Sequence, residues 1–273
     1  MNLGLLNPGA MGATIGAALV RSGHEVCWVA TDRSAESRER AATAGLTAVS
    51  SLAELAADAD GIVSVCPPHA ARAVAESVLA TGYHGAYLDA NAVSPATAAD
   101  LAGLVGSGYV DGGIVGPPAL REGTTRLYLS GQGATAVRDW FAEPVLGVSV
   151  VDERPTSASA LKMCYAAYTK GSSALLLAVR ALAEAEGVSD ALLEEWAISQ
   201  KDLPARVEGT ARGTAGKAWR FVGEMEEIAA TFEARDLPGG FHQAAADVYR
   251  RMSGLKAVSG AGLEDVLKAL LEQ

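Results

Sequence analysis

The stretch GLLNPGAMGATIG, residues 4–16, decides the fold of the first half of the chain. It departs at one position from the Gly-x-Gly-x-x-Gly turn that cradles a dinucleotide, because Asn7 stands where the first glycine is expected. Asparagine tolerates a positive φ better than most residues, so Asn7 is predicted to make the same tight turn. Gly9 is predicted to let the backbone approach a diphosphate, and Gly12 to let the following helix pack closely on the strand.

Composition limits the classes of protein to consider. The 273 residues are 49% hydrophobic and carry a formal net charge of −10, with no clustered run of Lys and Arg. Such a charge repels nucleic acid and anionic membranes, so neither is expected as a partner. Cys27, Cys66 and Cys164 are far apart and form no Cys-x-x-Cys pair. We therefore expect reduced thiols, a cytoplasmic location and no metal site.

Apolar runs alternate with Ala-rich helical stretches over the first half of the chain. The predicted strands are Leu3–Leu6, Glu25–Val29, Gly61–Val65, Ala86–Asp89 and Tyr109–Asp111. The predicted helices between them are Ala13–Arg21, Ser34–Ala44, Ser51–Ala57, Ala70–Ala80 and Pro95–Val105. This rhythm predicts an α/β domain with a doubly wound Rossmann-type parallel sheet, which Thr125–Ser130 and Val145–Val151 could extend. Ser94, before Pro95, is expected to cap its helix.

The pattern changes after Pro155. A long helical segment continues to about Gly187, and the rest is helical too, including Ala191–Ser199, Ala215–Ala234, Phe241–Met252 and Leu263–Leu271. The prediction is a dinucleotide-binding domain over residues 1–154 and an all-helical C-terminal substrate and dimerisation domain over residues 155–273. The acidic run at residues 224–227 is expected to be a solvated helix face.

The end of the second strand bears on the choice of cofactor. NAD sites usually place Asp or Glu there for the ribose 2′-hydroxyl, whereas NADP sites offer Arg to the 2′-phosphate. Asp32 is within reach by spacing, but Arg33 and Ser34 follow at once and Arg38 lies one helical turn further on. The segment, with Thr31 before it, favours NADP(H) over NAD.

These residues resemble the β-hydroxyacid dehydrogenase superfamily, which includes 3-hydroxyisobutyrate and 6-phosphogluconate dehydrogenases. The stretch GLLNPGAMGATIGAALVRSGHEV at 4–26 is similar to the opening of those proteins, SVCPP at 64–68 to a strand end near the adenosine ribose, and LDANAVSP at 88–95 to a ligand-binding loop. YVDGGIVGPPALREGTTRLYLSG at 109–131 lies where that superfamily has its substrate segment, and SASALKMCYAAYTKG at 157–171 where it has the helix of its catalytic lysine. The resemblance implies a nicotinamide-dependent enzyme with a small-molecule substrate, and a homodimer.

Carried over by residue, the resemblance implies that Lys162 is the catalytic lysine, which exchanges a proton with the substrate oxygen during hydride transfer. Burial in the apolar stretch ALKMCYAAY, beside an oxidised nicotinamide, is expected to lower the pKa of this amine. The residues expected to bind cofactor are Asn7, Pro8, Gly9, Ala10, Met11, Gly12, Thr31, Arg33, Ser34, Cys66, Pro67 and Asn91.

The substrate segment departs from the superfamily pattern. The residues expected to bind substrate are Asn91, Val115, Gly116, Pro117, Tyr165 and Thr169. Val115 stands where a carboxylate-binding Ser is usual, and Pro117 replaces a second Gly, which removes a hydroxyl and a backbone N–H. The stretch DGGIVGPP also resembles imine reductases. Two alternatives therefore stay open beside the dehydrogenase: an NADPH-dependent imine reductase and a catalytically silent nucleotide-binding protein.

Overall fold

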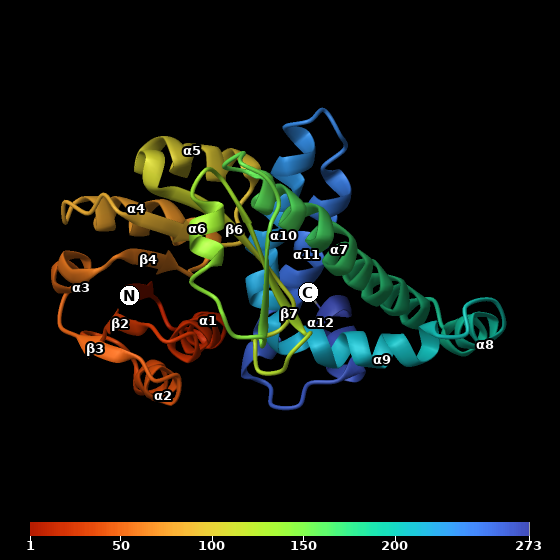
Figure 1. Cartoon of the computed structure of the whole chain (residues 1–273). Helices are drawn as coiled ribbons and strands as arrows, with labels where there is room; N and C mark the ends of the chain where they lie inside the picture. Colours follow the sequence, from red (N-terminus) through yellow and green to blue (C-terminus); the bar gives the residue numbers. More distant parts are fainter. Residues whose placement is uncertain (273) are drawn as a thin grey trace. The chain divides into compact units, whose positions relative to one another are not determined.

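The computed structural model describes residues 1–272, and its contacts divide the chain into two compact units. The first unit is Met1–Met163 and the second begins at Cys164, within one long helix. The first unit contains one eight-stranded sheet (Figure 1). Its strands are β1 (Asn2–Leu6), β2 (Glu25–Val29), β3 (Thr47–Val49), β4 (Gly61–Ser64), β5 (Ala86–Asp89), β6 (Tyr109–Val115), β7 (Thr125–Ser130) and β8 (Leu146–Val150).

The strand order is β3-β2-β1-β4-β5-β6-β7-β8, which contains the 3-2-1-4-5-6 order of a doubly wound dinucleotide-binding sheet. The prediction of that fold is confirmed, with one local difference. β7 runs antiparallel to β6, because the connection over residues 116–124 holds no helix to carry the chain back across the sheet. The short edge strand β3 was not predicted, since three residues carry too little alternation to stand out.

Helices cover both faces of this sheet. They are α1 (Ala10–Arg21), α2 (Ala35–Thr43), α3 (Leu52–Asp58), α4 (Ala71–Leu79), α5 (Pro95–Val105) and α6 (Ala134–Arg138), with the short 3₁₀ helices η1 (Pro68–Ala70) and η2 (Gly106–Gly108). One apolar core joins α1, α2 and α6 to one face, and a second joins α3, α4 and α5 to the other. Neighbouring residues on β5 show the alternation, because Leu88 belongs to the first core and Tyr87 to the second.

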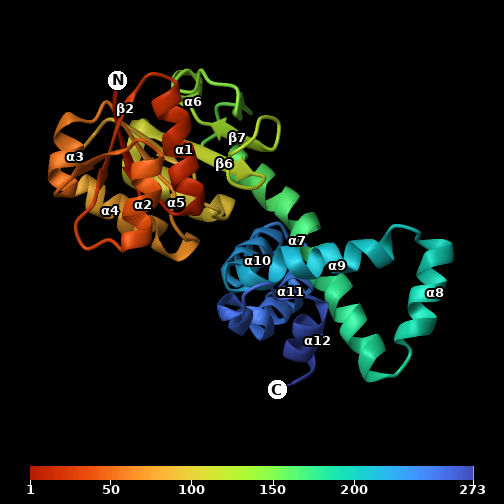
Figure 2. The same cartoon turned by 90° about the horizontal axis from the view of Figure 1, so that it is seen from below.

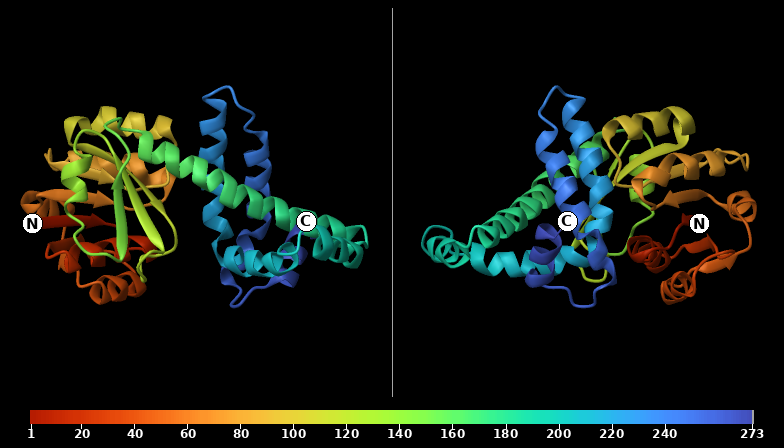
Figure 3. Two further views of the ribbon diagram at one scale, coloured as in Figure 1. Left: turned by 45° about the vertical axis from the view of Figure 1, so that its right-hand side comes forward. Right: turned by 180° about the vertical axis from the view of Figure 1, so that it is seen from behind.

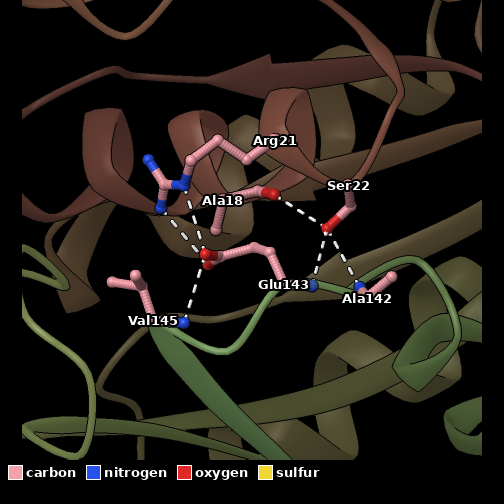
Figure 4. A network of polar contacts seen from close by, with 6 residues as sticks. All are labelled: Ala18, Arg21, Ser22, Ala142, Glu143 and Val145. Carbon is pink, nitrogen blue, oxygen red and sulfur yellow. Dashed lines mark hydrogen bonds and ion pairs between the residues drawn. The ribbon is translucent and has the colours of Figure 1, made fainter.

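A polar network fixes the C-terminal end of α1 (Figure 4). Glu143 accepts hydrogen bonds from the Arg21 guanidinium at 3.1 and 3.2 Å and from the backbone N–H of Val145 at 3.1 Å. The Ser22 hydroxyl accepts from the N–H groups of Ala142 and Glu143. These bonds join α1 to the segment before β8, so the helix that begins at the glycine turn is held at its far end.

The second unit is helical. It holds most of α7 (Ser157–Ala185), then α8 (Ser189–Ser199), α9 (Leu203–Thr214), α10 (Ala218–Glu233), α11 (Gly240–Arg251) and α12 (Leu263–Leu271), with the 3₁₀ helices η3 (Ala215–Lys217) and η4 (Met252–Ala257). Figure 2 shows α8 connecting the end of α7 to α9. In Figure 3, α10 and α11 lie side by side. The ring of Phe221 on α10 meets that of Tyr249 on α11 edge to face, with 5.2 Å between the ring centroids.

The predicted boundary between residues 154 and 155 leaves two residues before α7 begins at Ser157, and we keep it as a proposal. Among the helices of residues 1–272, none combines the length and the apolar character that a membrane span requires.

Candidate functional site

The glycine turn follows β1 at the carboxyl end of the sheet. Asn7 has a φ of 62°, which confirms the left-handed conformation predicted for it. Gly9 is the N-cap residue of α1, and no side chain of the described chain caps this helix. A Cβ built on Gly9 would meet no described atom within 4 Å. The turn therefore presents an open helix N-terminus, with space beside its backbone, which fits the approach of a diphosphate.

Gly12 has a different role from Gly9. A Cβ at this position would lie 2.6 Å from the carbonyl oxygen of Asn7 and 3.4 Å from the Cβ of Val65. The Asn7 carbonyl is part of the backbone, so it cannot move away from an added Cβ as the end of a flexible side chain can. The first turn of α1 is therefore packed directly on the strand ends, as predicted for Gly12.

The end of β2 carries the predicted 2′-phosphate residues. Asp32 has a φ of 58°, so the chain turns sharply here and leaves Arg33 exposed. The Thr31 hydroxyl donates to the carbonyl of Ser50 at 2.6 Å. The Ser34 hydroxyl caps α2 by accepting from the N–H of Ser37 at 3.2 Å. These bonds fix the turn on which Arg33 stands.

A cavity of about 320 Å³ joins the glycine turn to the end of β2, since Asn7, Val29, Arg33 and Val74 all line it. Its apolar walls and its single arginine suit an adenosine moiety. Arg40 adds a second cation near the turn, because its Nε donates to the carbonyl of Pro8 at 3.4 Å. Sequence reasoning missed Arg40, which lies on α2 seven residues after Arg33.

Asn91 connects the loops after β4 and β5. Its Oδ1 accepts from the N–H of Cys66 at 2.5 Å, and its Nδ2 donates to the Ser64 hydroxyl at 3.2 Å. The residue is 3% exposed. Both polar atoms are thus used to hold the loop that contains Cys66 and Pro67. The structure supports a positioning role for Asn91, and its contact with cofactor or substrate stays a prediction.

Two buried carboxyl groups lie side by side below that loop, because Asp89 on β5 pairs in register with Asp111 on β6. Burial raises the pKa of Asp89 from 3.8 to about 7, and the nearby Asp111 adds to the rise. Burial also raises the pKa of Asp111 to about 6, against the lowering effect of hydrogen bonds from Ser159 and Ser130. Oδ2 of Asp89 has no hydrogen-bond partner among the described residues.

Replacing Asp89 by asparagine is expected to stabilise the protein at pH 8 and to change its stability little at pH 4. The folded state holds the Asp89 proton more tightly than the unfolded chain, so wild-type stability falls as pH rises from about 4 to about 7. An asparagine at this position has no proton to lose, so the difference at pH 8 should be about 2–4 kcal/mol. Thermal unfolding of both chains at the two pH values measures this. An equal change in stability at pH 4 and pH 8 would contradict the raised pKa of the buried Asp89 carboxyl.

Lys162 lies on α7 within the first unit and is half-buried. The start of α7 rests on β6, where a Cβ built on Gly113 would lie 2.6 Å from the carbonyl oxygen of Ala158 and 3.1 Å from the Cβ of Lys162. β6 is parallel to β5, so Gly113 lies in the half of the strand nearest the ligand-binding edge of the sheet. Lys162 therefore lies toward the same edge as the glycine turn.

The predicted substrate segment also reaches the glycine-turn helix. Val115 ends β6 and is buried, whereas Gly116 has a φ of 119° and starts an exposed loop with Pro117. The backbone N–H of Ala119 in this loop donates to the hydroxyl of Thr14 on α1 at 3.1 Å. One edge of the first unit thus brings together the turn, the β6 loop and Lys162.

Tyr165 and Thr169 follow Lys162 on α7 and belong to the second unit. Tyr165 is 45% exposed, and the Thr169 hydroxyl donates to the carbonyl of Tyr165 at 3.1 Å. Their predicted contact with substrate stays a prediction.

The acidic run 224–227 departs in part from the solvated face predicted for it. Glu224 pairs with Lys170, and each of these two side chains is 15% exposed, while Met225 is fully buried. Lys170 lies on α7 and Glu224 on α10, so the acidic stretch by itself gave no sign of this ion pair.

Two family models match parts of the chain. A model described as "NADP oxidoreductase coenzyme F420-dependent" matches residues 2–88, and one described as "Domain of unknown function (DUF1932)" matches residues 183–252. A similar sequence is the "Uncharacterized 28.5 kDa protein in 7S RNA 5'region" of Methanothermus fervidus. It is 27% identical over 197 residues, which are 71% of this chain and 75% of the relative.

Solved structures share the fold over nearly the whole chain. A conserved protein of unknown function, described as structurally similar to 3-hydroxyacid dehydrogenases, is 25% identical with a TM-score of 0.69, over 94% of this chain and 98% of its own. Mycobacterium tuberculosis 3-hydroxyisobutyrate dehydrogenase with L-serine is 19% identical with a TM-score of 0.69, over 99% of both chains. A reductive aminase of Aspergillus terreus in complex with NADPH and ethyl levulinate is 17% identical with a TM-score of 0.58, over 98% of both. Together with the family models, these likenesses confirm the resemblance to the β-hydroxyacid dehydrogenase superfamily.

Proposed function

We propose that the chain is an NADP(H)-dependent oxidoreductase, which transfers hydride between the nicotinamide and a hydroxy-acid-like alcohol or its carbonyl. The observation that carries the proposal is the shared edge of the first unit. There the open N-terminus of α1 at Gly9 and the lysine held over Gly113 lie at the carboxyl ends of parallel strands. The family model over residues 2–88 and the hydroxyacid dehydrogenase fold support a nicotinamide cofactor.

In this proposal each part of the edge has one task. The backbone of the turn from Asn7 to Gly12 holds the diphosphate, and Arg33 with Ser34 holds the 2′-phosphate. A nicotinamide cofactor held there would supply the chemistry of hydride transfer. The Lys162 amine binds the substrate oxygen, takes its proton when an alcohol is oxidised, and returns a proton when a carbonyl is reduced.

A screen of substrates tests the proposed chemistry. NADPH oxidation is followed against aldehydes, 2- and 3-keto acids and cyclic imines, and the reverse reaction against hydroxy acids and hydroxy amino acids. Turnover of carbonyl compounds or hydroxy acids is the expected result. Turnover of cyclic imines alone would replace the proposal by an imine reductase, the second candidate, which the apolar Val115 and Pro117 favour. NADPH binding without any turnover would leave a nucleotide-binding protein.

Replacing Arg33 by alanine is expected to weaken NADPH binding by about 10- to 100-fold and to change NADH binding by less than about twofold. Charge-assisted hydrogen bonds to a phosphate are worth about 1.5–3 kcal/mol, and NADH lacks the 2′-phosphate that would receive them. Fluorescence titration with each nucleotide measures both affinities. Arg138→Ala, which removes an exposed arginine from α6, serves as the control. Equal losses for NADPH and NADH would contradict the 2′-phosphate assignment.

We also propose that the chain forms a homodimer through its second unit. α8 buries none of its described residues, and α7 exposes Tyr168, Leu175 and Leu182 at intervals of seven residues. Exposed apolar side chains that line one helical face suit contact with a second copy of the chain. Analytical ultracentrifugation of the full chain tests this, with a monomer as the contrary result.

A further inference from the structure

The first turn of α7 is capped by side chains from distant strands. The backbone N–H of Ser159 donates to Asp111 Oδ2 at 2.8 Å, and the Ser159 hydroxyl donates to Asp111 Oδ1 at 2.5 Å. The Ser130 hydroxyl accepts a hydrogen bond from the backbone N–H of Ala158 at 2.9 Å. The same hydroxyl donates to Asp111 Oδ2 at 3.1 Å. The first N–H groups of a helix lack partners within it, and a nearby residue usually supplies the cap. Here the cap of α7 comes from Asp111 on β6 and Ser130 on β7.

The strand below leaves no room for the helix to shift. Gly113 lies two residues after Asp111 on β6, so both face the same side of the sheet. The contacts of a Cβ on Gly113 with Ala158 and Lys162 show that α7 rests on bare strand backbone. Ser159 and Lys162 are three residues apart and lie on the same side of the helix. The contacts at Asp111 and Gly113 therefore fix the rotation and height of the start of α7, and with it the position of Lys162 in the next turn.

Holding a helix with a buried carboxylate carries a cost in desolvation. Asp111 and Ser130 are fully buried, and Ser159 is 1% exposed. The three donors and the helix N-terminus offset part of the desolvation of the carboxylate. Apolar side chains of the same volume would hold α7 without that desolvation. They would not set one rotation of the helix, because apolar contacts have no direction.

We infer that Asp111 is a positioning residue, whose carboxylate holds the first turn of α7 so that the amine of Lys162 meets the substrate oxygen. The inference rests on the proposed function, in which Lys162 exchanges the proton. Asp111 itself touches neither cofactor nor substrate in this account and acts through Ser159.

Replacing Asp111 by asparagine tests the inference, because the side chain keeps its shape and loses one acceptor. We expect kcat for the carbonyl substrate to fall by about 10- to 100-fold, since a shift of about 1 Å in a catalytic group costs about 100-fold. KM and the Kd for NADPH should stay within about threefold. Ser159→Ala keeps the backbone bond and loses the hydroxyl bond, so a smaller fall of about 3- to 10-fold in kcat is expected. It serves as the second variant if Asp111→Asn does not fold.

Asp152→Asn is the matched control. Asp152 also accepts a bond at the start of α7, from the Ser157 hydroxyl at 3.0 Å, but it does not bind the helix backbone. Its kcat should stay within about twofold of wild type. A folded Asp111→Asn chain with kcat within twofold of wild type would overturn the inference. A parallel loss of kcat, substrate affinity and NADPH affinity would also overturn it, because that pattern means general loss of structure.

Hydrogen exchange of the full chain separates this inference from the proposed function. The amides of Ala158 and Ser159 should exchange at least about tenfold faster in Asp111→Asn than in wild type and be unchanged in Asp152→Asn. If wild type turns over no substrate, the proposed function fails, and the exchange rates still decide whether Asp111 holds the turn. Unchanged rates at both amides would overturn the anchoring role.

Discussion

Replacing Lys162 by methionine is expected to lower kcat by about a thousandfold or more and to change NADPH affinity by less than about threefold. Methionine keeps the length and apolar stem of lysine but has no amine to bind the substrate oxygen or to move its proton. General acid–base groups contribute about 100- to 10,000-fold, and loss of binding to the oxygen adds to this. NADPH absorbance gives kcat, and fluorescence titration gives the affinity.

Lys268→Met is the control for this substitution, because Lys268 is an exposed lysine on α12. It should leave both quantities within twofold of wild type. Activity of the Lys162→Met chain above about a tenth of wild type would remove the amine from the mechanism. Loss of carbonyl turnover with retained turnover of cyclic imines would favour the imine reductase.

Adding one methyl group to each glycine of the turn should separate packing from cofactor binding. In Gly12→Ala the new Cβ meets the Asn7 carbonyl, so α1 must move from β1. We expect a loss of about 1–3 kcal/mol in the free energy of unfolding and at least about tenfold in NADPH affinity. In Gly9→Ala the new Cβ meets no described atom, so stability should stay within about 0.5 kcal/mol while NADPH affinity falls by about tenfold or more.

Denaturant unfolding and NADPH titration of the two variants measure this separation. Gly103→Ala on α5 is the control, since its Cβ would also meet no described atom and it lies outside the turn. Unchanged NADPH affinity in Gly9→Ala would show that the diphosphate does not approach the backbone there. Unchanged stability in Gly12→Ala would show that α1 adjusts without loss.

Local sequence signals predicted the first unit well. The positive φ of Asn7 followed from the conformational tolerance of asparagine, and Ser94 caps α5 as expected, by accepting from the N–H of Thr97. Such features depend on neighbouring residues, so one stretch of sequence suffices to find them. The alternation of apolar strands and Ala-rich helices likewise indicated the doubly wound sheet.

The contacts that build the site were harder to predict, because they join distant parts of the chain. Asp111 and Ser159 are 48 residues apart, and no local pattern indicates that a strand aspartate caps a later helix. The pairing of Asp89 with Asp111 depends on strand register. Glu224 looked solvated because its partner Lys170 lies on a different helix. In each case a side chain met a partner that only the tertiary fold supplies.

Titration of the purified full chain with NADPH and NADH, followed by nucleotide fluorescence, tests the central claim most directly. The account predicts saturable binding of NADPH that is at least about tenfold tighter than that of NADH, and that weakens by about tenfold or more in Gly9→Ala. Absence of binding by either nucleotide at millimolar concentration would contradict it, because the open turn at Gly9 would then have no dinucleotide to hold.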